Sequence, residues 1–181
     1  MSRLIFYYSG MGAGKSAHLL QKAHNLQSKG AVVSRYTHVL DRRWGRGKIV
    51  SRIGIEAPAN VYDTNTEFGY GWEKGAWVFI DEAQFLTKGQ VFKLASLVDA
   101  IGVNILCYGL RTDFMGEPFE GSTYLMAWAD EMREIESHDQ LGDKATFNIR
   151  IDNQGHRIQE GNQIEIGTHY KSVSRREFFR N

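Results

Sequence analysis

The feature that most constrains this chain is a glycine-rich loop that follows a short apolar run near the N-terminus. Residues 4–8 read Leu-Ile-Phe-Tyr-Tyr, and residues 9–16 read Ser-Gly-Met-Gly-Ala-Gly-Lys-Ser. A strand, such a loop and then a helix form a cradle of backbone N–H groups for phosphate oxygens, because glycine lets the chain approach them closely. The helix also directs the positive end of its dipole at the anion. The sequence therefore predicts a nucleoside triphosphate site.

Two side chains of this loop have specific expected roles. Lys15 is expected to reach the β- and γ-phosphates, and the Ser16 hydroxyl is expected to bind Mg²⁺. Ser9 departs from the usual pattern, which has glycine at that position. The loop residues predicted to bind the nucleotide are Ser9, Gly10, Met11, Gly12, Ala13, Gly14, Lys15 and Ser16.

The composition limits the classes of partner. The 22 Lys and Arg and 21 Asp and Glu residues give a net charge of +1, which argues against a nucleic-acid-binding protein with its usual basic face. The single cysteine, Cys107, excludes an intrachain disulfide and a cysteine metal cluster, and its apolar surroundings indicate a buried, inert thiol. No apolar stretch approaches the ~20 residues that a membrane span needs, so we expect a cytoplasmic protein.

The order of apolar and polar segments predicts an α/β fold in two parts. Residues 1–132 are expected to form a nucleotide-binding core with a parallel sheet, and residues 133–181 a small β-rich subdomain. In the core we expect strands over residues 4–8, 31–33, 77–80 and 103–110, and helices over residues 16–29, 88–101 and 122–129. The second helix follows a capping-box pattern that begins at Thr87.

The remaining segments are less regular. Residues 36–51 are polar and basic, and we expect a mobile loop, which is either simply solvated or a flap that faces the phosphates. Residues 53–62 are compatible with one short strand. The C-terminal part is expected to form an antiparallel sheet from residues 145–151, 157–158, 163–166 and 170–173.

A pair of carboxylates follows the apolar run at residues 77–80. Asp81 lies where a phosphate loop needs a second Mg²⁺ ligand, at the end of a neighbouring buried strand. Beside it, Glu82 is placed to accept a proton from whichever hydroxyl attacks the γ-phosphorus. That hydroxyl belongs to water in an ATPase and to an acceptor molecule in a kinase, and spacing alone leaves both open. A helicase motor is disfavoured, because it usually needs two such cores and a basic face.

Several stretches together resemble the type II thymidine kinases, the cellular and bacterial small-subunit family. The loop at residues 6–16 is similar to the bacterial form of that family, including Ser9. The other matching stretches, in order, are Asp-Arg-Arg at 41–43, Ser-Arg-Ile-Gly at 51–54, Asp-Glu-Ala-Gln-Phe at 81–85, Cys-Tyr-Gly-Leu-Arg-Thr-Asp-Phe at 107–114, Gly-Asp-Lys-Ala at 142–145 and Glu-Gly-Asn-Gln-Ile-Glu-Ile-Gly at 160–167. The resemblance covers essentially the whole chain.

The resemblance implies a P-loop core of the RecA-like type and a C-terminal subdomain with a lasso loop. It implies transfer of the γ-phosphoryl group of ATP to the 5′-hydroxyl of thymidine with Mg²⁺, and Glu82 as the base on that hydroxyl. Asp81 and Ser16 would hold the metal, and Asp41, Arg43 and Gln84 would complete the nucleotide-binding set. The thymidine-binding residues that it implies are Met11, Phe85, Leu110, Phe114, Phe119, Asn148, Ile164, Ile166, Gly167 and Tyr170.

The family also suggests a homotetramer and feedback binding of dTTP. Two other functions stay open at this point: a catalytically weak nucleotide-binding regulator, and a stand-alone P-loop ATPase.

One departure from the family concerns zinc. The family usually carries a structural zinc ion on four Cys or His ligands, and the corresponding positions here read Asp139, Leu141, Ser174 and Glu177. A tetrahedral structural zinc site needs soft N or S donors, and leucine cannot bind a metal at all, so we expect no zinc in this chain. The subdomain is then expected to rely on packing, with Trp128, Phe147, Phe178 and Phe179 as the substitutes.

Overall fold

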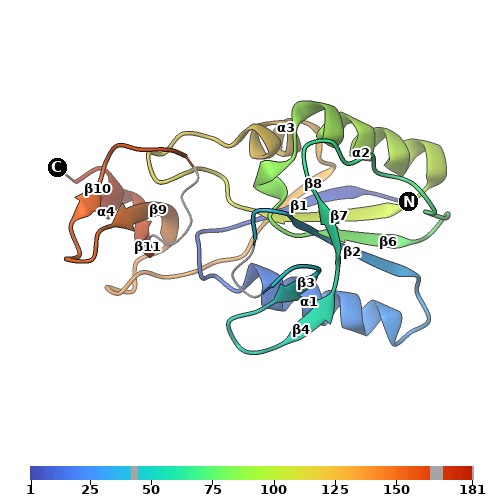
Figure 1. The fold of residues 1–181 in the computed structure, drawn as a ribbon, viewed down its shortest axis with the longest axis horizontal. Coiled ribbons are helices and arrows are strands. Elements are labelled where there is room, and N and C mark those ends of the chain that lie inside the picture. The colour runs from blue at the N-terminus through green and yellow to red at the C-terminus, as the bar shows by residue number, and fades with distance from the viewer. Residues whose placement is uncertain (42–44, 164–168, 181) are drawn as a thin grey trace.

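The computed structural model describes residues 1–41, 45–163 and 169–180, and its centre is a six-stranded sheet. All neighbouring strands are parallel, in the order β5-β2-β6-β7-β1-β8 (Figure 1). Their bounds are β1 (Leu4–Tyr8), β2 (Val33–His38), β5 (Asn60–Tyr62), β6 (Trp77–Ile80), β7 (Asn104–Gly109) and β8 (Glu131–Glu134). The predicted α/β class with a parallel core is confirmed.

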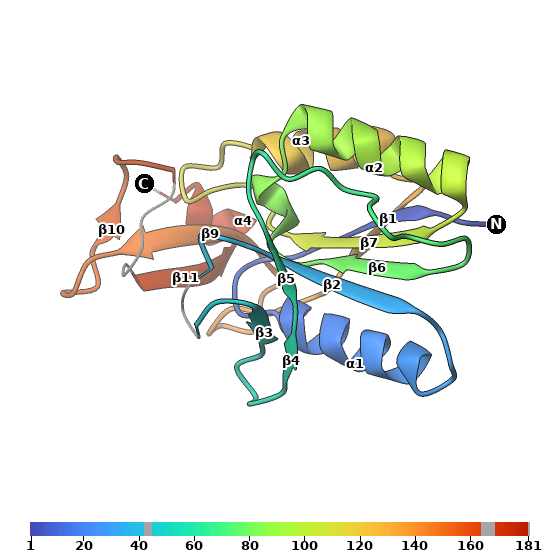
Figure 2. The same cartoon turned by 45° about the vertical axis from the view of Figure 1, so that its right-hand side comes forward.

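Helices cover both faces of this sheet. Helix α1 (Lys15–Gln27) lies on one face, and α2 (Lys88–Ile101) and α3 (Glu120–Trp128) lie on the other (Figures 1 and 2). The capping box of α2 is confirmed, because the Thr87 side chain accepts a hydrogen bond from Gln90 N and the Gln90 side chain accepts one from Thr87 N. No helix in the described part of the chain is both long and apolar enough to cross a membrane.

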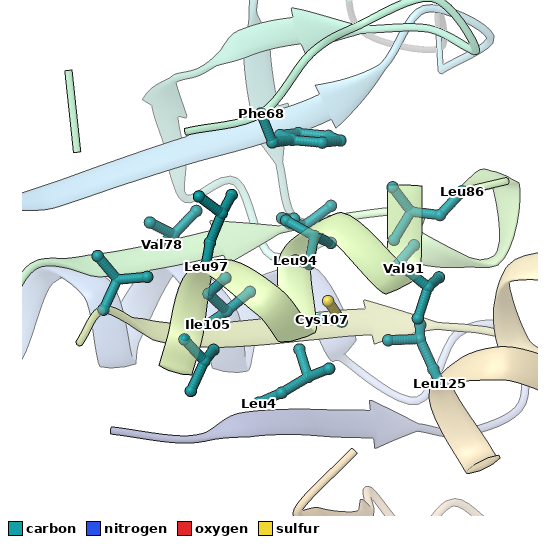
Figure 3. Packing of buried hydrophobic residues seen from close by; sticks show 14 of the residues in the cluster. Leu4, Phe68, Val78, Leu86, Val91, Leu94, Leu97, Ile105, Cys107 and Leu125 are labelled. Atoms are coloured by element: carbon teal, nitrogen blue, oxygen red, sulfur yellow. The ribbon is translucent and has the colours of Figure 1, made fainter. Parts of the chain in front are cut away.

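Side chains of the central strands alternate between two buried clusters, one on each face. In β1, Leu4 and Phe6 join the cluster beneath α2 and α3, whereas Ile5 and Tyr7 join the cluster over α1. Strands β6 and β7 alternate in the same way. Figure 3 shows the first cluster, with Leu94 of α2 pointing toward the sheet. A strand buried on both faces needs an unbroken apolar run, which is why these three strands could be predicted.

The described residues of the segment expected to be a loop, 36–41 and 45–51, contain the end of one strand and the whole of another. Strand β2 begins at Val33 and continues through Tyr36, Thr37 and His38, and these last three residues pair with β5. Strand β3 (Lys48–Val50) pairs with β4 (Glu56–Pro58), and Ile49 is buried against α1. The sequence does not indicate residues 36–38 of β2 as a strand because their side chains are polar, yet β2 pairs with β5 on one side and β6 on the other.

Strand β8 was not predicted. It reads Glu-Met-Arg-Glu and pairs with β1 at the edge of the sheet, where charged side chains can face solvent. It crosses the expected boundary between residues 132 and 133, and we therefore propose to place the end of the core after Glu134.

The C-terminal part contains a three-stranded antiparallel sheet in the order β10-β9-β11. Its elements are β9 (Ala145–Ile151), β10 (Arg157–Ile158), β11 (His169–Ser174) and a single turn of helix, α4 (Arg175–Phe178). The predicted strands at 145–151, 157–158 and 170–173 are confirmed. Of the strand expected over residues 163–166, Gln163 lies outside any strand and the rest falls outside the described residues.

Aromatic packing and one carboxylate hold this subdomain together. The Phe147 and Phe178 rings stack with centroids 4.4 Å apart, and Phe179 meets Phe147 edge-on at 5.6 Å. The expectation for Trp128 was wrong, because its ring packs on Tyr124 of the same helix, α3, at 4.8 Å. A hollow of about 530 Å³ opens in the subdomain, and Leu141, Arg157 and Ser174 are among the residues that line it.

Asp139 is one of the four residues at the positions where the resemblance implies zinc ligands. Its carboxylate accepts the N–H of Leu141 at 2.9 Å, of Asp143 at 3.0 Å and of Ser174 at 3.2 Å. The carboxylate thus joins a turn before β9 to the end of β11. No group of three or more His, Cys, Asp or Glu that could hold a metal ion exists among residues 1–41, 45–163 and 169–180. The absence of zinc from the protein stays a prediction.

Replacing Asp139 by alanine is expected to lower the melting temperature by several degrees, because three N–H groups lose their acceptor. Partial desolvation raises the pKa of Asp139, but the hydrogen bonds from Leu141, Asp143 and Ser174 outweigh it and hold the pKa below its ordinary value of 3.8. A depressed carboxyl pKa means that this stabilisation is complete above the unfolded-state pKa and is lost as the pH falls through the folded-state value.

The measurement is a thermal melt at pH 7 and at pH 3, with the exposed Asp143 mutated to alanine as the control from the same turn. Wild-type protein should melt at the same temperature with and without a zinc chelator. Equal melting temperatures for the wild type and D139A, or a loss of stability on chelation, would contradict this account.

Candidate active site

The phosphate loop connects β1 to α1 and has the backbone of an anion cradle. Gly12 and Gly14 have φ of 77° and 86°, values that favour glycine, and Gly14 caps α1. The Lys15 ammonium lies over the loop and donates to Gly10 O at 2.9 Å and to Ser9 Oγ at 3.2 Å. Ser9 is buried and its hydroxyl also donates to Gly10 O at 2.9 Å, which gives the unusual serine a place in the loop.

Ser16 and Asp81 meet at the carboxyl end of the sheet. Ser16 lies in the first turn of α1, after β1 and the loop, and Asp81 directly follows β6. Strands β1 and β6 are separated by β7, yet the Ser16 hydroxyl donates to Asp81 Oδ2 at 2.9 Å. Burial raises the pKa of Asp81 to about 7, and the Glu82 carboxylate adds to this; Ser16, the Glu82 N–H and Lys15 act in the opposite direction. A divalent cation would favour the ionised carboxylate. A hydroxyl and a carboxylate oxygen side by side fit the hard-ligand preference of Mg²⁺.

Glu82 follows in a strained backbone conformation. With φ 54° and ψ 37°, it is the only residue other than glycine with positive φ in the described ranges. Its N–H donates to Asp81 Oδ1 at 3.0 Å, and the Tyr62 hydroxyl donates to its carbonyl oxygen at 2.8 Å. Left-handed backbone in a non-glycine residue costs about 1–3 kcal/mol and persists where the surroundings enforce it, often at functional sites.

Gln84 positions the Glu82 side chain. The buried Gln84 amide donates to Glu82 Oε2 at 2.6 Å and accepts the N–H of Leu110 at 3.1 Å. It therefore joins the carboxylate to the end of β7. The predicted contact of Gln84 with the nucleotide stays a prediction.

Two glycines allow the backbone around Glu82 to be packed from both sides. A Cβ on Gly109 would lie 2.9 Å from the Gln84 N and side-chain oxygen. A Cβ on Gly121, in α3, would lie 2.5 Å from Ala83 O and 2.8 Å from Leu86 O. Helix α3 thus rests directly on the carbonyl groups of the turn that carries the carboxylate.

Replacing Gly121 by alanine is expected to destabilise the protein by about 1–3 kcal/mol, because a methyl group does not fit between these carbonyls and α3 must shift. Gly89→Ala is the matched control in α2, where the nearest atom to an added Cβ is Thr87 Oγ1 at 3.9 Å. That variant should be as stable as the wild type, or more so by up to ~1 kcal/mol, since alanine favours helix. Urea denaturation measures both changes, and equal stabilities of G121A and G89A would refute the close packing.

Several of the predicted thymidine-binding residues lie near this turn and are buried. Phe85 meets Phe119 edge-on with centroids 5.8 Å apart, and Leu110, Phe114 and Phe119 are buried. Phe85 also lies 4.9 Å from the ring of His38. Of the other predicted residues, Arg43, Ile164, Ile166 and Gly167 lie outside the described residues, and Asp41 is described, with its N–H donating to His38 O at 2.9 Å.

The small sheet is docked on the phosphate loop. Asn148 of β9 is buried and accepts the Met11 N–H at 2.7 Å, and the Ser172 hydroxyl of β11 donates to Met11 O. A Cβ on Gly10 would lie 3.0 Å from Ser172 Oγ. Asn148 and Met11, both predicted to face thymidine, are thus brought together.

Two arginines near the site were missed by sequence reasoning. Arg52 follows β3, and one of its terminal nitrogens would lie 3.2 Å from a Cβ on Gly12, so its positive charge is held beside the phosphate loop. In the sequence, the only indication of a role for Arg52 was that it belongs to the stretch 51–54, which resembles the family. Arg150 of β9 is buried among the predicted nucleoside-binding residues, and its signal was a charged residue within an otherwise apolar strand.

Comparison with known proteins gives one consistent result. A family model described as "Thymidine kinase" matches residues 2–178. The chain is 48% identical over 187 residues to the thymidine kinase of Xanthomonas campestris pv. campestris (strain 8004), covering 98% of this chain and 90% of that protein. It is 44% identical to the thymidine kinases of Vibrio vulnificus (strain YJ016), over 98% of this chain and 97% of that protein, and of Vibrio cholerae serotype O1, over 96% and 94%.

Proposed function

Because the chain belongs to the thymidine kinase family, we propose that it transfers the γ-phosphoryl group of ATP to the 5′-hydroxyl of thymidine, giving dTMP and ADP. The observation that carries this proposal is the position of Glu82, a carboxylate held by Gln84 directly after the Ser16–Asp81 pair. That arrangement puts a proton acceptor beside the place where a triphosphate would be held.

The phosphate side of the site is formed by the loop and the carboxyl ends of β1 and β6. In this proposal the backbone N–H groups of residues 10–16 and the Lys15 ammonium bind the β- and γ-phosphates. Ser16 and Asp81 supply the oxygen ligands for Mg²⁺, which when bound neutralises charge on the phosphates. Asp41 and Arg43 complete the nucleotide-binding set.

Glu82 acts as the general base. As the 5′-oxygen of thymidine forms its bond to the γ-phosphorus, the hydroxyl proton passes to the Glu82 carboxylate. The bond from the γ-phosphorus to the bridging oxygen breaks, and its electron pair leaves with ADP. Gln84 donates to Oε2 of Glu82 and thereby fixes the orientation of the carboxylate, including that of Oε1.

The nucleoside side uses apolar and aromatic contacts. Phe85, Leu110 and Phe119 supply the flat apolar surfaces that hold a pyrimidine, and Tyr170 and the segment 164–168 close the pocket from the small subdomain. Backbone N–H and C=O groups of that segment read the polar edge of the base in this proposal.

Three further properties are proposed on the resemblance to the family: a cytoplasmic location, a homotetrameric assembly and feedback inhibition by dTTP. Light scattering of the purified protein tests whether it is a tetramer, and adding dTTP to the kinase reaction tests the feedback inhibition.

The central test mixes the purified protein with ATP, Mg²⁺ and thymidine and follows dTMP and ADP separately. We expect both products in equal amounts and no ADP without a nucleoside. ADP formation without thymidine would instead identify a stand-alone ATPase, and tight thymidine and ATP binding without turnover would identify a regulator.

A further inference from the structure

Arg150 is the largest fully buried side chain in the described part of the protein, with 1% of its surface exposed. Its charge cannot be left in an apolar interior without compensation, because an unsatisfied buried charge is strongly destabilising. The contacts that compensate this charge therefore indicate what the side chain holds in place.

The Arg150 guanidinium is compensated by aromatic rings and oxygen atoms. Its central carbon lies 3.8 Å from the centroid of the Phe114 ring and 5.6 Å from that of Tyr170. Its Nε donates to the Tyr170 hydroxyl at 3.3 Å, and a terminal nitrogen donates to Asn162 O at 2.5 Å. Cation–π contacts of desolvated arginine are among the stronger ones of this type.

These contacts fall on both sides of the segment 164–168. Asn162 precedes the segment, and Tyr170 follows it within β11, directly opposite Arg150 in the β9–β11 pairing. Gln163, which also precedes the segment, donates a side-chain hydrogen bond to the buried Asp113 at 3.1 Å. Phe114 is the next residue after Asp113. One guanidinium therefore contacts Asn162, Tyr170 and Phe114, which come from three different parts of the chain.

We propose that Arg150 is a positioning residue for thymidine, which fixes Phe114, Asn162 and Tyr170 as one wall of the nucleoside pocket. This inference rests on the proposed function, since it assigns the wall to the nucleoside of that reaction. Arg150 does not itself take part in phosphoryl transfer. Its loss should therefore weaken nucleoside binding and leave ATP binding unchanged.

The test compares Arg150→Met and Arg150→Lys with Arg157→Met. Arg157 is a matched control in the same small sheet: its guanidinium lies 4.5 Å from the Phe178 ring and donates to Phe178 O at 2.6 Å, on the side of α4. We expect R150M to raise KM for thymidine roughly 10-fold or more, because hydrogen bonds to a charged group are worth about that factor. KM for ATP should change less than about twofold in all three variants.

The lysine variant separates charge from shape. Lysine keeps the positive charge but lacks the planar fork that can stack on Phe114 while it bonds to Asn162 and Tyr170. R150K is therefore expected to raise KM for thymidine less than R150M and more than R157M, and it provides a folded variant if R150M proves unstable. Equal KM values for thymidine in the wild type and both Arg150 variants, or equal increases in R150M and R157M, would overturn the proposal.

Failure of the proposed function can be told apart from failure of this inference. If the wild type forms no dTMP, the kinase proposal fails, and Arg150 is still tested by amide hydrogen exchange at Asn162, Gln163 and Tyr170. R150M should exchange faster than R157M at these positions in the protein without ligand. Equal exchange in the two variants would remove the assigned role of Arg150.

Discussion

Replacing Glu82 by glutamine is expected to lower kcat for dTMP formation by about 10²–10⁴-fold, the usual contribution of a general base. Glutamine has nearly the same shape as glutamate but cannot accept the proton of the 5′-hydroxyl. KM for ATP and the melting temperature should change little, because the Lys15, Ser16 and Asp81 contacts do not involve the Glu82 side chain. Initial rates at saturating thymidine, with a thermal melt of each protein, measure the effect.

The exposed Glu73 provides the control, since E73Q removes a carboxylate before β6 without touching the site. Its kcat should equal that of the wild type. If E82Q retained the wild-type kcat, Glu82 would not be the base and the proposed mechanism would have no proton acceptor. If E82Q lost ATP binding as well, the Glu82 carboxylate would have a role in binding the triphosphate and not only in accepting the proton.

Replacing Lys15 by alanine is expected to lower kcat by about 10²–10³-fold, the cost typical of removing one group that stabilises charge in the transition state. Unlike E82Q, this variant should also raise KM for ATP, because the ammonium interacts with the phosphates both before and during transfer. The two variants thus differ in a measurable way: one loses turnover alone, and the other loses turnover and triphosphate affinity.

Lys22→Ala is the matched control for this second variant. Lys22 lies on the same helix, and its ammonium donates to the Tyr7 hydroxyl at 2.9 Å, away from the loop. K22A should retain kcat and KM for ATP within about twofold. A K15A variant with unchanged KM for ATP would show that the glycine-rich loop does not hold the triphosphate through this side chain.

The close approach of Ser16 and Asp81 could be predicted because it depends on local sequence. Ser16 follows the loop directly, Asp81 follows an apolar run of four residues, and parallel strands necessarily bring their carboxyl ends to one edge. The Thr87–Gln90 capping box is equally local, and it was predicted and observed.

The missed features depend on contacts between distant segments. Tyr36 gives no strand signal in its own polar surroundings, yet it pairs with β5 and β6 on either side. In β9, Phe147, Ile149 and Ile151 face the small core, so the intervening Arg150 projects to the opposite face. That face is usually solvated, and nothing in the strand itself indicates that Phe114 and Tyr170 cover it.

The docking of the small sheet on Met11 has a consequence for how the substrates are bound. Strand β9 contacts the phosphate loop through Asn148 and the nucleoside wall through Arg150, two residues apart on one face. If the proposed sites are correct, a displacement of this strand on nucleoside binding would also move the loop that is proposed to bind the triphosphate. By thermodynamic linkage, whatever affinity thymidine adds to ATP, ATP must add equally to thymidine. Titrating each ligand in the presence and absence of the other yields that coupling free energy directly.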